Sequence, residues 1–137
     1  VYAGAKAATT NFSKALAVEF APEAIRVNCV VPDTTPSQGN IDAMPETVRA
    51  ELGKLSPEAL AAMLQMYVPM GAAPTAEDLA EAALFLVSDR ARSITGIALH
   101  VDGGTSAAAG FVNWPHGDGF LPAPLAGTLS RLFPHRA

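Results

Sequence analysis

The sequence predicts an α/β domain, because helix-like and strand-like patterns alternate along most of the chain. A long alanine-rich helical pattern precedes a β-branched run, and later an amphipathic helical pattern precedes a second short apolar run. The chain has 137 residues, of which 50% are hydrophobic, so it is long enough for one domain with a core and too short for two ordinary domains. We therefore expect a single domain that mixes helices and strands.

The first predicted helix spans residues 3–20, which are rich in alanine. Its apolar side chains recur at spacings of three and four and so form one helical face: Phe12, Ala15, Leu16 and Phe20. Pro22 fits a chain that is leaving this helix. The β-branched run Ile25–Val31, IRVNCVV, then predicts a buried strand whose hydrogen-bond ladder Pro32 would interrupt.

A loop and two short helices are predicted next. Residues 33–40, DTTPSQGN, collect turn-forming residues and predict the loop. The segments MPETVRAELGKL and SPEALAAMLQMY each place a proline near a helix start, and Ser56 would cap the second helix. The apolar residues of this excursion, residues 42–67, are expected either to line a pocket or to pack on the core: Met44, Leu52, Leu55, Leu60, Met63, Leu64 and Met66.

A further helix and strand follow the excursion. In TAEDLAEAALFLVSD, Thr75 and Asp78 stand three residues apart ahead of an apolar stripe, as in a capping box with Asp in place of Glu. The segment SITGIALHVDGG predicts a turn at Gly96, a strand over residues 97–101 and a sharp bend at Gly103–Gly104.

The C-terminal segment, residues 106–137, has a different composition from the rest of the chain. It is rich in Gly, Pro and Ala, and its apolar residues follow no clear period. We expect this tail to be irregular or to depend on a partner for its structure. Trp114 and Phe120 could form an interface patch there or be unstructured.

Composition and charge exclude several classes of function. Nine Lys and Arg stand against thirteen Asp and Glu with no basic stripe, so we expect no nucleic-acid partner. The chain contains no run of eighteen apolar residues and no signal-peptide pattern, so we expect a cytoplasmic protein with no membrane partner. Cys29 is the only cysteine, which excludes an internal disulfide. The spacing of His100, His116 and His135 does not predict a metal site.

Four segments in order resemble the C-terminal half of a classical short-chain dehydrogenase/reductase. YAGAK is similar to the family's Tyr-x-x-x-Lys motif, IRVNCVVP to the strand that ends at its Pro-Gly, PTAEDLAEAALFLVSDRARSITG to its penultimate helix and turn, and ALHVDGG to its final strand. The resemblance covers residues 2–105, so residues 1–105 are expected to form this half of the domain, with residues 42–67 as its substrate lid. It implies the C-terminal part of a Rossmann-like, doubly wound parallel sheet.

The same resemblance implies a nicotinamide cofactor, NAD or NADP. It does not extend to the part of the family's domain that binds the phosphates of this cofactor. The Gly-rich turn, an Asn-Asn-Ala-Gly segment and the catalytic serine belong to the family's N-terminal half, and no segment of this sequence supplies them. We therefore expect the chain to need a missing N-terminal half.

Tyr2 and Lys6 are the candidate catalytic residues. Residues four apart lie on one face of a helix, so the phenol and the ammonium can point the same way. A nearby ammonium favours the phenolate and lowers the pKa of a tyrosine. The resemblance implies that Tyr2 is the general acid/base and that Lys6 lowers its pKa and binds the nicotinamide ribose. The alternative is a solvated Tyr and Lys at a chain end.

The candidate cofactor loop follows the first predicted strand. Where the family has Pro-Gly, then a hydrophobic residue and a threonine, this chain has Pro32, Asp33, Thr35 and Ser37. Ser37 keeps a hydroxyl, whereas Asp33 adds a side chain and a negative charge in place of glycine. Ordinary turn chemistry of Asp and Thr is the alternative interpretation of this loop.

Two functions stay open from the sequence. The first is an oxidoreductase that transfers hydride between a nicotinamide and a small-molecule alcohol or ketone. The second is a catalytically inactive fragment or an oligomerisation module derived from that family. Because two strands cannot form a stable doubly wound sheet, we expect either a homo-oligomer or a complementary N-terminal half to supply further strands.

Overall fold

The computed structural model describes residues 1–33, 35–114 and 119–122 of the chain. These residues form two compact units, each built from two separate stretches of sequence. The first unit holds residues 1–32 and 75–101, and the second holds residues 33–74 together with the described residues from 102 onward. The boundary predicted at residue 105 stays a prediction.

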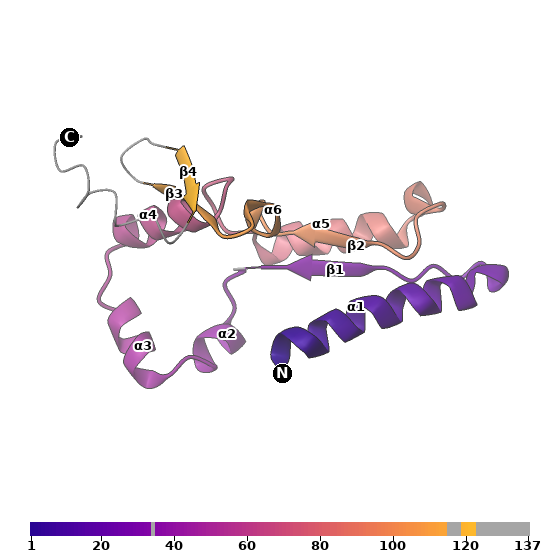
Figure 1. The fold of residues 1–137 in the computed structure, drawn as a ribbon, viewed down its shortest axis with the longest axis horizontal. Coiled ribbons are helices and arrows are strands. Elements are labelled where there is room, and N and C mark those ends of the chain that lie inside the picture. The colour runs from indigo at the N-terminus through magenta and orange to yellow at the C-terminus, as the bar shows by residue number, and fades with distance from the viewer. Residues whose placement is uncertain (34, 115–118, 123–137) are drawn as a thin grey trace. The chain divides into compact units, whose positions relative to one another are not determined.

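The first unit contains a parallel two-stranded sheet with helices before, between and beside its strands (Figure 1). Its elements in chain order are α1 (Tyr2–Glu19), the 3₁₀ turn η1 (Ala21–Glu23), β1 (Cys29–Pro32), α5 (Ala76–Val87), the 3₁₀ turn η2 (Asp89–Ala91) and β2 (Ala98–Val101). Cys29 lies opposite Ala98, and Pro32 lies opposite Val101. The predicted mixed α/β class with parallel strands is confirmed.

Strand β1 begins four residues later than the sequence predicts. Arg26 donates from its two terminal nitrogens to the carbonyls of Ile94 (3.2 Å) and Ser88 (3.3 Å). Asn28 donates to the Ile94 carbonyl at 3.0 Å and accepts from the Ile97 amide at 3.2 Å. These side chains bind the turn that precedes β2 instead of extending the ladder. They thereby fix the register in which the two strands meet.

A capping box starts helix α5, as the sequence predicts. The Thr75 hydroxyl accepts from the Asp78 amide at 3.2 Å, and the Asp78 carboxylate accepts from the Thr75 amide at 2.8 Å. The carboxylate also accepts from the Thr75 hydroxyl at 3.0 Å. Aspartate therefore closes the box although its side chain is one methylene shorter than that of the usual glutamate.

Replacing Thr75 with Ala is expected to destabilise the fold by about 1 kcal/mol, because the first turn of α5 loses its side-chain cap. The measurement is urea unfolding followed by circular dichroism. Thr9→Ala is the matched control, since the Thr9 hydroxyl bonds back to the Ala5 carbonyl inside α1 and alanine is the better helix former there. Equal losses in both variants would contradict a capping role.

The capping box also predicts how stability depends on pH. Hydrogen bonds from the Thr75 amide and then the Thr75 hydroxyl lower the pKa of Asp78 below its ordinary 3.8. A pKa that is lowered in the folded state stabilises the fold at pH values above the ordinary pKa. This stabilisation is lost as the pH falls through the folded-state pKa. The urea concentration at the unfolding midpoint should therefore decrease as the pH is lowered through this acid range. In Asp78→Asn it should decrease less. The Ser56 hydroxyl lowers the pKa of Glu58 likewise, so only the difference between the two proteins is diagnostic.

The second unit carries the helical excursion and the chain that follows β2 (Figure 1). Its described elements are α2 (Gln38–Asp42), α3 (Glu46–Leu52), α4 (Pro57–Tyr67), α6 (Thr105–Ala108), β3 (Phe111–Trp114) and β4 (Gly119–Pro122). The two predicted helices are α3 and α4, and Ser56 caps α4 as predicted. Helix α2 instead occupies part of the predicted loop, because the Ser37 hydroxyl accepts from the Asn40 amide and caps a short helix.

Part of the segment 106–137, which the sequence predicts to be irregular or to depend on a partner, forms regular strands. Strands β3 and β4 pair as an antiparallel hairpin, with Phe111 opposite Pro122 and Trp114 opposite Gly119. Aromatic residues favour a pleated surface even where strict alternation is missing, which is why the absence of a period misled the prediction. Residues 115–118 and 123–137 lie outside the described residues.

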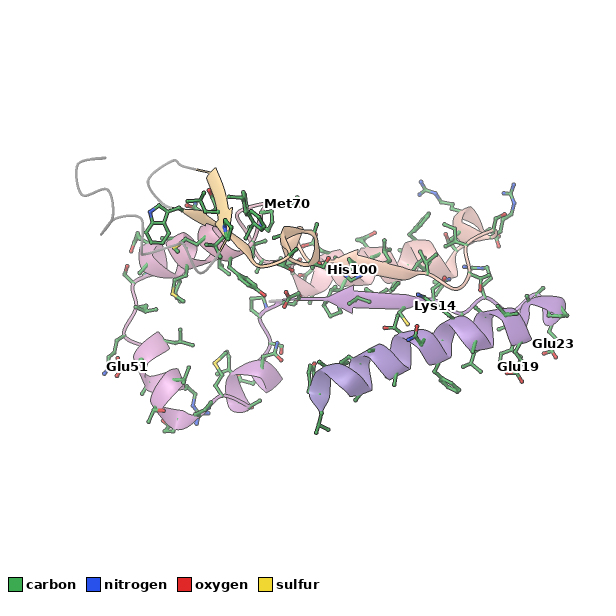
Figure 2. All side chains as sticks on the ribbon, in the orientation of Figure 1. Lys14, Glu19, Glu23, Glu51, Met70 and His100 are labelled. Atoms are coloured by element: carbon green, nitrogen blue, oxygen red, sulfur yellow. The ribbon has the colours of Figure 1, made fainter. Side chains whose placement is uncertain are left out.

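A sharp bend follows β2 at the position that the sequence predicts. Gly103 and Gly104 both have positive φ angles, 62° and 94°. The Asp102 carboxylate is 5% exposed and accepts from the amides of Gly104 (2.8 Å) and Ser106 (3.1 Å), which holds the bend closed. Across the bend, the Met70 amide donates to the Gly103 carbonyl at 3.0 Å. Met70 itself is largely exposed (Figure 2).

Among the residues that the structure describes, no helix is both long enough and apolar enough to cross a membrane.

Candidate active site

Tyr2 and Lys6 lie on the first turns of helix α1 and contact each other. The Lys6 Nζ atom is 5.3 Å from the centre of the Tyr2 ring, within the range of a cation–π contact. The Tyr2 side chain is 76% exposed, so its hydroxyl is open to solvent. The i, i+4 spacing therefore brings the pair together as predicted. The ammonium lies over the ring, which is a different contact from one with the hydroxyl.

The candidate cofactor loop divides between the two units. Pro32 ends β1 in the first unit, whereas Asp33, Thr35 and Ser37 belong to the second. Asp33 accepts a hydrogen bond from the Tyr67 hydroxyl at 3.1 Å. The structure thus places Tyr2, Lys6 and Pro32 in one unit and the other three predicted residues in another.

The second half of this loop is held by Asn40. The Asn40 side-chain amide donates to the Thr35 carbonyl at 3.0 Å, while its backbone amide donates to the Ser37 hydroxyl at 3.2 Å. The Thr35 hydroxyl is buried and has no hydrogen-bond partner among the described residues. A buried hydroxyl of this kind is a donor and acceptor for a polar ligand.

These residues fit the polar parts of a nicotinamide cofactor. Tyr2 and Lys6 present an exposed hydroxyl and ammonium, and the Thr35 and Ser37 hydroxyls add hydrogen-bonding groups on the loop. Asp33 brings a negative charge, and its carboxylate is engaged by Tyr67. Each unit by itself therefore carries polar groups of the kind that hydrogen-bond ribose or amide groups.

Tyr67 and Asn40 are site neighbours that the sequence did not reveal. Tyr67 stands 34 residues from its partner Asp33, so no local spacing connects them. Asn40 lies among turn-forming residues, where its side chain cannot be told from an ordinary cap.

Two cavities of the second unit differ in whether predicted lid residues line them. A groove of about 400 Å³ is lined by Thr47, Val48, Glu51, Leu52 and Leu55, of which two were predicted. A second cavity of about 440 Å³ lies between Pro69, the bend and the hairpin, and its lining includes Phe120 but none of the predicted lid residues. Leu60 and Met63 are 39% and 48% exposed.

Within residues 1–33, 35–114 and 119–122, no group of three or more His, Cys, Asp or Glu side chains is placed to hold a metal ion. His116 and His135 lie outside the described residues.

Comparison with known proteins assigns the chain to a family. Residues 1–106 match the family described as enoyl-(acyl carrier protein) reductase. The 2-(S)-hydroxypropyl-CoM dehydrogenase 3 of Xanthobacter autotrophicus is 40% identical over 107 residues, which are 77% of this chain and 39% of that protein. The inactive 2-(S)-hydroxypropyl-CoM dehydrogenase 2 of the same organism is 39% identical over 107 residues, 77% of this chain and 43% of that protein.

Solved structures give the same result. Carveol dehydrogenase from Mycobacterium avium, in complex with NAD, superposes with a TM-score of 0.65 and 33% identity, covering 77% of this chain and 39% of that one. The chain belongs to the short-chain dehydrogenase/reductase family. It aligns with roughly the C-terminal 40% of these Rossmann-fold proteins, and so spans about two fifths of the length of the relatives it matches.

Proposed function

We propose that the chain is the C-terminal half, which carries the catalytic helix α1, of an NAD(P)-dependent oxidoreductase. This enzyme transfers hydride between a nicotinamide and an alcohol or ketone. The observation that carries the proposal is the placement of Tyr2 and Lys6 side by side at the start of α1, in a chain whose residues 1–106 match the family. The NAD-bound carveol dehydrogenase supports the choice of cofactor.

In this proposal the two residues divide the proton chemistry. Tyr2 gives a proton to the ketone oxygen in reduction and takes it from the alcohol in oxidation, acting as general acid/base. Lys6 stabilises the phenolate by its positive charge and hydrogen-bonds the ribose. The nicotinamide supplies or accepts the hydride when it is bound.

The loop residues would hold the cofactor. Thr35 and Ser37 offer hydroxyls to its polar groups, and Pro32 and Asp33 shape the chain that leaves β1. Thr35 has the clearest support, since its buried hydroxyl lacks a partner among the described residues.

A partner that completes the domain is part of the proposal. Among the described residues, the parallel sheet of the first unit has two strands, which leaves an outer edge on each strand for further pairing. Large apolar side chains on its helices are exposed, among them Phe12 (63%), Val18 (77%), Leu84 (61%) and Val87 (75%). Unpaired edges and an apolar surface favour a complementary N-terminal half, or a second copy of the chain.

We expect the purified 137-residue chain to be dimeric or partly unfolded when no partner supplies strands. Sedimentation and calorimetry test this expectation together. A monomer that melts in one cooperative transition would contradict it.

An inactive family member is the alternative. The high exposure of Tyr2 and the position of the Lys6 ammonium over its ring favour it, because catalysis falls steeply when a group is displaced by even about 1 Å. A relative whose printed name calls it inactive shows that such proteins occur among those similar to this chain.

NADH and NADPH titrations followed by fluorescence separate the two functions. The chain is measured alone and after fusion behind the N-terminal part of 2-(S)-hydroxypropyl-CoM dehydrogenase 3, joined before the residue aligned with Val1. Under the enzyme proposal, binding appears in the fusion. Absence of binding in both proteins would favour the inactive alternative.

A further inference from the structure

A hydrogen bond in the second unit joins the candidate cofactor loop to α4, the last helix of the predicted lid, which is called the lid helix below. The Tyr67 hydroxyl, on the last residue of α4, donates to the Asp33 carboxylate at 3.1 Å. Asp33 is the first residue after β1 and stands where the resemblance places a glycine. A glycine has no side chain to accept this bond, so the contact depends on the aspartate at this position.

The end of α4 provides a fixed base for the Tyr67 ring. Val68 follows directly and is completely buried, and its amide donates to the Leu64 carbonyl at 2.7 Å. The Met70 amide then donates to the Gly103 carbonyl at 3.0 Å, which joins this segment to the bend closed by Asp102. A tyrosine side chain has only two rotatable angles, so little freedom is lost when its hydroxyl is held.

The loop is thus held at both ends. Asn40 fixes the part around Thr35 and Ser37, and Tyr67 fixes its first residue. A hydrogen bond to an ionised carboxylate is stronger than one between neutral groups, which suits the Tyr67–Asp33 pair for this role.

We infer that Tyr67 is a positioning residue, which acts through Asp33 to hold the loop that binds the cofactor against the end of the lid helix. Displacement of α4 then shifts the start of the loop, and binding at the loop restrains the helix. The inference rests on the proposed function for the identity of the ligand, but the contact itself can be tested without any ligand.

Hydrogen exchange of the Asn40 and Ile41 amides measures the order of the loop, since both amides bond to Ser37. In the full chain, Tyr67→Phe and Asp33→Ala should each speed this exchange by about three- to tenfold. The double variant should exchange no faster than either single variant, because both remove the same bond. Asp33→Asn keeps an oxygen acceptor and should retain most of the protection.

Tyr2→Phe is the matched control, since it removes the other phenol of the chain and should leave these two amides unchanged. The Leu60 amide, inside α4, reports whether each variant keeps its helix. Unchanged exchange in Tyr67→Phe with α4 intact, or fully additive effects in the double variant, would overturn the inference.

A second measurement uses the fusion that restores the N-terminal half. Tyr67→Phe should weaken NADH binding by a factor similar to its effect on exchange and change kcat less. If the fusion binds no NADH while the exchange results hold, the proposed function fails and the contact stands. If NADH binds normally and exchange is unaffected, the inference fails and the proposed function stands.

Discussion

Tyr2→Phe should lower kcat of the completed enzyme by at least about a hundredfold, because the variant has no hydroxyl to exchange a proton with the substrate oxygen. NADH affinity should change far less, since the phenylalanine keeps the ring that Lys6 contacts. The measurement is the change in NADH absorbance with the best substrate from a panel of secondary alcohols and ketones. The fusion with the N-terminal part of the relative is the protein to assay.

Lysine substitutions on the same helix supply the control. Lys6→Met removes the ammonium beside Tyr2 and should reduce kcat and also weaken NADH binding, since the proposal gives Lys6 both roles. Lys14→Met makes the same chemical change farther along α1 and should leave both quantities close to those of the parent (Figure 2). Activity that survives in Tyr2→Phe would exclude Tyr2 as the acid/base and favour the alternative in which Tyr2 and Lys6 are a solvated pair with no role in proton transfer.

Local signals allowed much of the first unit to be predicted. Helix α1 is alanine-rich, and the capping box at Thr75 lies within four residues of sequence, so both elements follow from nearby chemistry. The start of β1 was misplaced because Arg26 and Asn28 bind carbonyls more than 60 residues away. A β-branched run cannot reveal a partner at that distance.

The candidate site shows the same division between local and distant information. The spacing of Tyr2 and Lys6 placed them on one face of a helix, but it could not show that the ammonium lies over the ring. The partner of Asp33 was not predictable, since Tyr67 is brought to it only by the fold of the second unit. The contact between two residues on neighbouring turns of one helix was predictable from their spacing, whereas the contacts of the candidate cofactor loop became known only from the structure.

The bend after β2 carries the largest stability prediction. Gly103→Ala should destabilise the fold by about 2–5 kcal/mol, combining the cost of a positive φ with that of overpacking. A Cβ atom at this position would lie 2.4 Å from the Val68 Cγ1 atom and 3.3 Å from the Ala72 carbonyl oxygen. Val68 is fully buried and cannot yield easily, so the clash must displace backbone.

Gly110→Ala separates these two costs. Gly110 also has a positive φ, 86°, but a Cβ atom there would meet nothing within 4 Å. This variant should therefore lose only about 1–2 kcal/mol, measured by urea unfolding beside Gly103→Ala. A Gly103→Ala loss no larger than that of Gly110→Ala would mean that Val68 and the bend can move apart. In that case the bend could not be the fixed base on which the Tyr67–Asp33 contact depends.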